Sequence, residues 1–225
     1  TPSPPAIATV LPSGAKTTAY DPGLRVAFVV RDPGAPVAAD SPGSPGSPRS
    51  NGRTVDALVS LVDGMPTVLE ACGIEAPDEL HGRSLLRWTR GAGPPDDWTD
   101  EIFVSHTFHE VTMYYPMRAV RTPRHKLVWN LAHPLPFPFA SDLWRSSTWQ
   151  SALTEGEDAL YGRRTIAAYL RRPRLELYDL VNDPDELENL AGRPEHAELE
   201  AELVLRLRTF QHATRDPWRF KWERE

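Results

Sequence analysis

The sequence has few of the features that would assign the chain to a common class. It contains one cysteine, Cys72, so no disulfide can form within it. No apolar run reaches the length of about eighteen residues that a membrane-spanning helix needs. Positive charge is not in excess either, because 25 Lys and Arg face 31 Asp and Glu, for a net charge of −6. A chain of this charge is not expected to bind nucleic acid or an anionic membrane.

Signals of the secretory route are also missing. The opening residues TPSPPAIATVLPSG carry neither a charged region nor a long apolar stretch, so we do not expect a signal peptide there. No N-x-S/T glycosylation sequon is present; the asparagines that fail it are Asn51, Asn130, Asn182 and Asn189. The sequence therefore leaves the compartment unknown.

Length and proline content indicate how the chain is organised. With 225 residues, 40% of them hydrophobic, one or two domains are expected. Most of the 23 prolines fall in recognisable loops. The Pro/Gly/Ser-rich segment within 36–52 predicts a flexible linker or inserted loop, and GAGPPDDW at 91–98 predicts a boundary. We therefore expect two parts, 1–90 and 91–225.

Hydrophobic periodicity predicts the elements of the first part. LRVAFVVRD at 24–32 is typical of a buried strand. Residues 54–73 have apolar side chains at helical spacing, with Pro66 breaking the helix in two and Gly73 ending it. Cys72 lies on the apolar stripe of that helix and is expected to be a small buried hydrophobic residue.

The second part is expected to contain an antiparallel sheet and a long helix. Two strands, 117–121 and 126–131, are joined by the turn TPRH, and a further strand is predicted at 174–180. Residues 142–170 read as short helical pieces, and 194–214 as an amphipathic helix with a Glu-rich start. The expected class is therefore α+β, with a helix that covers an antiparallel sheet.

The segment SHTFHEVTMYYPMR at 105–118 concentrates the chemistry of the chain. His106, His109 and Glu110 form an H-x-x-H-E pattern, which resembles zinc motifs but has a spacing of three in a β-rich context. Three interpretations are open: a zinc site, a structural pair of histidines, or a loop that faces a ligand. The mixture of polar side chains favours the loop, because loops on a rigid scaffold carry function.

Other charged residues have simpler explanations. Lys16 lies in a Gly-flanked loop and would suit an anion such as phosphate, sulfate or carboxylate, but a solvated surface lysine is the plainer alternative. The acidic stretch ELYDLVNDPDELENL is explained by capping of a turn and a helix. RHKLVWNLAH is interpreted as a basic strand with exposed edges.

Several of these segments together resemble the sulfatase superfamily. AKTTAYDPGLRVAFVVR resembles the segment that carries a basic residue after the central metal-binding motif, and VSLVDGMPTVLEACGI and HGRSLL resemble the elements that follow. ELYDLVNDPDELENLA is similar to an element near the C-terminus of many sulfatases. The stretch from SHTFHEV to SSTWQ resembles the sulfamidase branch, the heparan N-sulfatases or N-sulfoglucosamine sulfohydrolases.

The resemblance implies a fold and a role for several residues. The chain would be the C-terminal part of the alkaline-phosphatase-like sulfatase α/β fold, with 1–90 a remnant of the N-terminal domain and 91–225 the C-terminal subdomain. Lys16 would contact sulfate, and the substrate-binding residues would be His106, His109, Glu110 and Arg118. The substrate would be an N-sulfated or O-sulfated amino sugar of glycosaminoglycan type. Relatives are lysosomal, secreted or periplasmic.

The sequence departs from the family pattern in its first residues. No C-x-P-x-R or S-x-P-x-R motif occurs, so the formylglycine precursor is not in this chain. The aspartates that bind calcium are also missing, and PPAIATVL stands where such a motif is expected. The resemblance therefore implies partnership with a missing N-terminal half and inactivity alone, with a homodimer left open. The alternatives are a non-catalytic sulfated-carbohydrate-binding module and a vestigial fragment.

Overall fold

The computed structural model describes residues 18–30, 54–90, 92–94, 98–111 and 113–224. The chain divides into two compact units. The smaller unit is Ala27–Ile102, and the larger unit combines Thr1–Val26 with Phe103–Glu225. The predicted linker at 36–52 lies outside the described residues, and the functional division at residue 90 stays a prediction. Among the described residues, no helix is long and apolar enough to cross a membrane.

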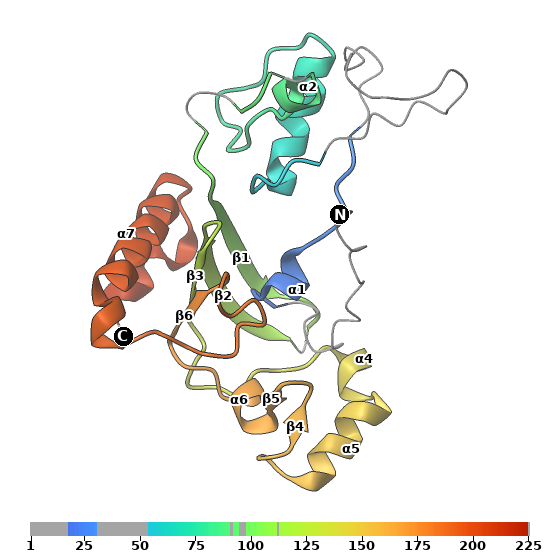
Figure 1. Ribbon diagram of the computed structural model, residues 1–225, viewed down its shortest axis with the longest axis vertical. Helices are drawn as coiled ribbons and strands as arrows, with labels where there is room; N and C mark the ends of the chain where they lie inside the picture. Colours follow the sequence, from blue (N-terminus) through green and yellow to red (C-terminus); the bar gives the residue numbers. More distant parts are fainter. Residues whose placement is uncertain (1–17, 31–53, 91, 95–97, 112, 225) are drawn as a thin grey trace, which may run out of the picture. The chain divides into compact units, whose positions relative to one another are not determined.

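The larger unit is built on a four-stranded antiparallel sheet (Figure 1). The strands lie in the order β1 (Ile102–Phe108), β2 (Tyr114–Arg121), β3 (His125–Asn130) and β6 (Leu175–Asp179). The register pairs Ala119 with Val128 and Leu127 with Leu177. The predicted strands and the turn between β2 and β3 are confirmed.

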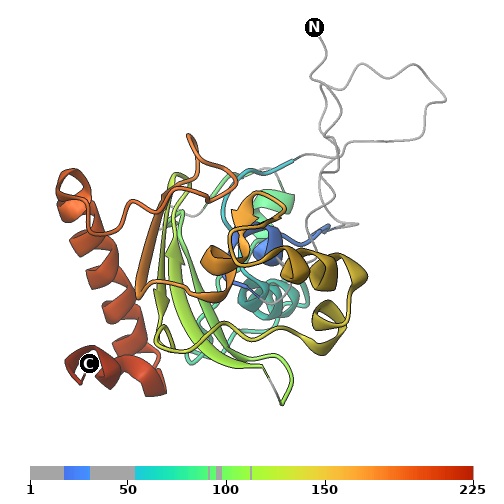
Figure 2. The ribbon, with the colours of Figure 1, turned by 90° about the horizontal axis from the view of Figure 1, so that it is seen from below.

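Both faces of this sheet are covered. Side chains of a strand alternate between its two faces, and those of β2 and β3 enter two different apolar clusters. One cluster contains Tyr115, Met117, Ala119, Val128, Phe137, Phe139, Trp149, Ile166 and Tyr169. The other contains Val120, Leu127, Trp129, Leu177, Leu190, Leu203 and Leu207. Figure 2 shows α7 (Ala197–Ala213) on one side of the sheet and the helices of 141–170 on the other.

The long C-terminal helix confirms the prediction for 194–214. A short 3-10 turn, η3 (Pro194–His196), leads into α7, and η4 (Pro217–Glu223) follows it. Leu203 and Leu207, four residues apart on one helical face, are each 1% exposed. Phe210 extends that face and stacks on Phe103 of β1 with ring centroids 4.0 Å apart. The helix is therefore held by packing on the sheet.

The opposite face carries a layer of short elements. These are α4 (Ser141–Trp144), α5 (Ser147–Glu155), β4 (Leu160–Tyr161), β5 (Arg164–Thr165) and α6 (Ile166–Leu170). The proline-rich run before α4 has no regular structure, as its three prolines on alternate residues imply. Aromatic rings fill this layer; Phe139 stacks on Tyr169 with centroids 4.7 Å apart and lies 4.0 Å from Trp149.

β3 overturns the interpretation of RHKLVWNLAH as a strand with exposed edges. It lies between β2 and β6 and pairs with both. Lys126 and Trp129 are each 0% exposed. Lys126 belongs to a buried ion pair, described below, whereas Arg124 before the strand is exposed and pairs with Asp179.

The smaller unit contains η2 (Leu61–Asp63), α2 (Gly64–Ala71) and α3 (Leu86–Thr89). The prediction for 54–73 is confirmed only in its second half, because 54–60 is irregular. Gly73, with φ of 69°, ends the helix as expected. Cys72 is exposed, so its predicted burial is wrong. The apolar stripe predicted for this helix is itself exposed, with Val62 at 57% and Met65 at 58%, and the buried residues of α2 are Pro66 and Thr67.

Close packing in the smaller unit explains the HGRSLL segment. Asp63 accepts hydrogen bonds from the backbone N–H of Ser60 and of Arg83, each at 2.8 Å, and Thr67 Oγ1 accepts one from Leu85 N–H at 2.9 Å. A Cβ added to Gly82 would lie 2.0 Å from the Val62 carbonyl oxygen. Only glycine allows this approach of two backbone segments.

The predicted strand at 24–32 is not formed in the part of it that the structure describes. Asp21–Leu24 is a short helix, α1, with a proline in its first turn, and residues 25–30 are irregular. Val29 is 91% exposed, and Val26, Phe28 and Val30 are also exposed. A strand needs a hydrogen-bonded neighbour, and no described strand pairs with this segment.

Candidate functional site

Lys16, the predicted sulfate contact, lies outside the described residues, but the segment that follows it is held firmly. Thr18, Ala19 and Tyr20 are buried. Tyr20 Oη donates to Glu176 Oε2 at 2.7 Å, and the backbone N–H of Asp21 donates to Glu186 Oε2 at 2.8 Å. The chain is therefore fixed to the β6 side of the sheet within a few residues of Lys16.

The anchor of this segment is a buried ionic cluster around Asp21. Arg121 donates to both oxygens of Asp21, at 3.1 and 2.9 Å, and Lys126 Nζ contacts the same carboxylate. Lys126 also bonds to Glu186 Oε1 at 2.6 Å. The Lys126 and Glu186 side chains are both 0% exposed. Two carboxylates thus surround one buried ammonium, with Arg121 as the second cation.

The pKa values in this cluster follow from burial and charge. Burial alone would raise the pKa of Asp21, but the Arg121 hydrogen bond and the charge of Lys126 outweigh it and lower that pKa to about 2. For Glu186, burial dominates over the charge of Lys126, so its pKa lies above the ordinary value. Asp21 is therefore the firmly ionised member of the cluster.

A second buried carboxylate, Glu176, is saturated with hydrogen bonds. It accepts from Tyr20 Oη, from Tyr178 Oη and from Asn130 Nδ2, the last at 2.5 Å. The Arg164 guanidinium lies 4.0 Å from the Tyr20 ring centroid. Glu176 and Glu186 in the acidic stretch are thus buried hydrogen-bond partners, Glu176 in this network and Glu186 in the cluster around Asp21. Capping explains Asp183, which accepts from Glu188 N–H at 2.8 Å, but it does not explain those two glutamates.

The turn between β1 and β2 carries the predicted substrate residues His109 and Glu110. It is closed by two backbone bonds, from His109 N–H to Met113 O at 3.2 Å and from Met113 N–H to Glu110 O at 2.8 Å. The Glu110 carboxylate accepts the Ser141 N–H at 2.5 Å, and this bond lowers the pKa of Glu110. The turn is thereby tied to the start of α4.

His106 and Arg118 are brought together below this turn. His106 Nδ1 lies 3.1 Å from the Tyr115 carbonyl oxygen, and its buried Nε2 has no hydrogen-bond partner among the described residues. Burial lowers the pKa of the His106 ring. Arg118 Nη1 donates to the His106 carbonyl at 2.8 Å, and its Nε donates to Asp216 Oδ2 at 2.6 Å. The Arg118 guanidinium therefore joins β1 and β2 to the turn between α7 and η4.

The structure gives no support to the zinc interpretation in the part of the chain that it describes. No group of three or more His, Cys, Asp or Glu side chains that could hold a metal ion occurs among the described residues. His106 lies on a strand with one ring nitrogen directed at a backbone carbonyl. The roles of His106, His109, Glu110 and Arg118 in substrate binding stay predictions.

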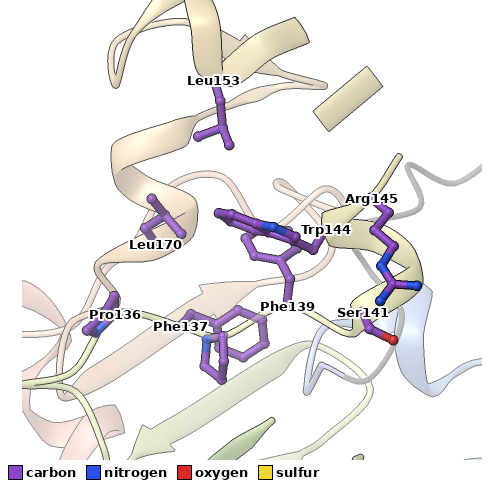
Figure 3. Close-up of a pocket in the computed structure, with 9 residues that line it drawn as sticks. Pro136, Phe137, Phe139, Ser141, Trp144, Arg145, Leu153 and Leu170 are labelled. Atoms are coloured by element: carbon purple, nitrogen blue, oxygen red, sulfur yellow. The ribbon is translucent and has the colours of Figure 1, made fainter. Parts of the chain in front are cut away.

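A pocket that sequence reasoning did not find lies beside Ser141, on the face opposite α7. Its volume is about 570 Å³, and Figure 3 shows the Trp144 and Phe139 rings in its centre with Arg145 to one side. The remaining lining residues are Pro136, Phe137, Pro138, Ser141, Leu153 and Leu170. The alternation of Pro and Phe at 136–139 is the sequence signal for this pocket. The prolines keep the segment from forming a helix, and its phenylalanine rings line the pocket.

Comparison with known proteins places these features in a family. A family model described as "N-sulphoglucosamine sulphohydrolase, C-terminal" matches residues 16–134. The human N-sulphoglucosamine sulphohydrolase is 36% identical over 219 residues, which are 92% of this chain and 40% of the human protein. An ulvan-active sulfatase of Formosa agariphila is 26% identical over 199 residues, 84% of this chain and 33% of that protein.

Solved structures give a partial match. A phosphonate monoester hydrolase from Silicibacter pomeroyi superposes with a TM-score of 0.48 and 20% identity, covering 76% of this chain and 28% of that one. The chain thus spans less than half of the length of the relatives that it matches.

Proposed function

Because the chain belongs to the N-sulphoglucosamine sulphohydrolase family of the sulfatases, we propose that it forms the C-terminal portion of a sulfamidase-like sulfatase. Its substrate class is an N-sulfated or O-sulfated amino sugar of glycosaminoglycan type. The observation that carries this proposal is the 36% identity to the human relative across 92% of the chain. Two local observations support the proposal: Tyr20 and Asp21 are held by buried hydrogen bonds, and Glu110 in the turn is bonded to Ser141.

Each predicted residue has a chemical task in this proposal. The Lys16 ammonium neutralises a sulfate oxygen. The turn at His109 and Glu110 offers polar groups to the hydroxyls of the sugar ring. His106 and Arg118 position that turn, because the guanidinium bonds to the His106 carbonyl and to Asp216.

In the complete enzyme, calcium and formylglycine would supply electrostatic stabilisation of the sulfate and the nucleophile that attacks sulfur. We propose that both groups belong to an N-terminal half outside this chain. The basis for this proposal is the sequence, in which no C-x-P-x-R or S-x-P-x-R motif occurs. The 225-residue chain alone is accordingly proposed to be catalytically incomplete.

A chimera tests the proposed function. Residues 16–225 replace the matching portion of the human relative, and sulfate release from N-sulfoglucosamine is measured for the chimera and for the 225-residue chain alone. We expect release by the chimera only. Lys16→Ala should lower kcat of the chimera by roughly 100-fold, the usual cost of losing one electrostatic contact in a transition state, whereas Lys221→Ala should not change it. A correctly folded chimera with no activity, or equal kcat in both lysine variants, would contradict the proposal.

The binding-module alternative gives a different result in the same experiment. It is favoured by the aromatic pocket beside Ser141, which does not depend on the missing half. A non-catalytic module would bind N-sulfoglucosamine as the isolated chain, while the folded chimera would release no sulfate.

A further inference from the structure

The pocket beside Ser141, called here the Trp144 pocket, has a rigid aromatic base. Phe139 in its floor contacts Trp149 and Tyr169, with centroids 4.0 and 4.7 Å away, so its ring is fixed from below. Trp144 lies 6.3 Å from Phe139 and is 49% exposed. A ligand that enters the pocket therefore contacts the partly exposed Trp144 indole and the Phe139 ring, which is packed against Trp149 and Tyr169.

Arg145 is the one charged residue in the described lining of this pocket. Its side chain is exposed and forms no hydrogen bond or ion pair with the described residues, although its backbone N–H donates to Ser141 O at 3.2 Å. Other surface arginines are used differently; Arg163 pairs with Asp185, and Arg171 pairs with Glu157 at 2.5 Å. The pocket thus offers an unpaired guanidinium in a chain whose net charge is −6.

The size of the pocket suits a small ligand. Its volume of about 570 Å³ falls within the range of roughly 300–1,000 Å³ that is typical of small-molecule sites. Such sites combine apolar and aromatic walls with a few polar groups that fix the orientation of the ligand. Planar guanidinium groups bind carboxylate and sulfate-like oxyanions through paired N–H donors.

We propose that the Trp144 pocket binds the ring of an anionic sugar. The apolar C–H face of the ring packs on Trp144 and Phe139, and its sulfate or carboxylate group binds Arg145. The choice of sugar as the ligand class rests on the proposed function. The Glu110–Ser141 hydrogen bond joins the rim of this pocket to the turn that carries His109, so the two form one continuous binding surface for a sulfated glycan.

Titration of the 225-residue chain tests the pocket directly. N-sulfoglucosamine and its neutral counterpart N-acetylglucosamine are added; dissociation constants are measured by titration calorimetry in every variant, and the indole N–H signals in ¹⁵N-edited NMR spectra locate the binding site in the unmodified chain. The variants are Trp144→Ala and Arg145→Gln, with Arg163→Gln as the matched control for an exposed arginine outside the pocket. The Trp144 and Arg145 side chains are exposed, and an unchanged melting temperature verifies that each variant folds.

The expected result is a shift of the Trp144 signal by N-sulfoglucosamine. The dissociation constant should rise about tenfold in each pocket variant, equivalent to about 1.4 kcal/mol, and stay unchanged in Arg163→Gln. Equal affinity for the neutral sugar, equal affinity in folded pocket variants, or no shift at millimolar ligand would each overturn the inference. Sulfate release by the chimera is measured separately, so loss of the pocket proposal and loss of the proposed function remain distinguishable.

Discussion

At the scale of single residues, the most consequential group is the buried ammonium of Lys126. It is enclosed by Asp21 and Glu186 and joins the segment after Lys16 to β3 and to the loop after β6. A buried ion pair adds little net stability when compared with a well-packed apolar replacement, but the loss of one partner leaves a charge without compensation. The cluster therefore specifies where the segment Thr18–Asp21 docks.

Lys126→Met should lower the free energy of unfolding by about 3–5 kcal/mol, because Asp21 and Glu186 lose their shared buried cation. Urea denaturation followed by circular dichroism measures this change. The control is Arg163→Met, which breaks the exposed pair with Asp185 and should cost about 1 kcal/mol or less. Similar losses in the two variants would show that the buried cluster is not the anchor.

The pH dependence of stability isolates Asp21. Its folded pKa of about 2 lies below its ordinary value of 3.8. The ionised carboxylate therefore stabilises the fold above pH 4, and this contribution disappears as the pH falls toward 2. Asp21→Asn should lose about 2 kcal/mol at pH 7 and decline less than the wild type between pH 4 and pH 2. Parallel pH profiles, obtained by urea denaturation, would contradict this assignment.

Some of these residues could be predicted from the sequence and others could not. The 105–118 segment drew attention because its polar side chains are adjacent in the chain. Lys126 was placed on an exposed edge instead, because its partners Asp21 and Glu186 are 105 and 60 residues away. Local patterns contain no information on pairings of that range.

At the scale of elements, prediction succeeded where one face of an element packs on a neighbour in the same unit. The 3.6-residue period of α7 and the alternation of β2 both reflect such packing. The strand expected at 24–32 has an apolar sequence but no described partner, so composition alone could not form it. Residues 54–60 fail in the same way, since apolar spacing without a packed face does not produce a helix.

The packing of α7 can be measured by two leucines of the same helix. Leu203 is 1% exposed and belongs to the cluster under the sheet, whereas Leu205 is 66% exposed. Leu203→Ala should lower the unfolding free energy by about 2–5 kcal/mol, and Leu205→Ala should change it by about 0.5 kcal/mol or less. Equal effects in urea denaturation would mean that α7 does not pack through the Leu203 face.

At the scale of the whole molecule, several exposed apolar side chains fall in groups of neighbouring residues. Val26, Phe28, Val29 and Val30 precede the smaller unit's helices, and that unit also exposes Leu61, Val62, Met65, Val68 and Ile74. Single exposed apolar residues are common, but runs of them mark contact surfaces. The chain spans 40% of its human relative, and we expect the remaining part of such a protein to cover these residues.

The isolated chain and the chimera should therefore respond differently to the same substitutions. In the isolated chain, Val29→Ser and Val68→Ser should reduce fluorescence of a bound anilinonaphthalene sulfonate dye and leave the melting temperature unchanged, because both side chains are exposed. In the chimera, where the human half is expected to bury them, each should lower the unfolding free energy by about 1–3 kcal/mol. Val128→Ser, which places a hydroxyl in the apolar cluster of Phe137, Phe139 and Trp149, should destabilise both proteins. If Val29→Ser and Val68→Ser leave the chimera as stable as before, these valines do not form the surface that the N-terminal half covers.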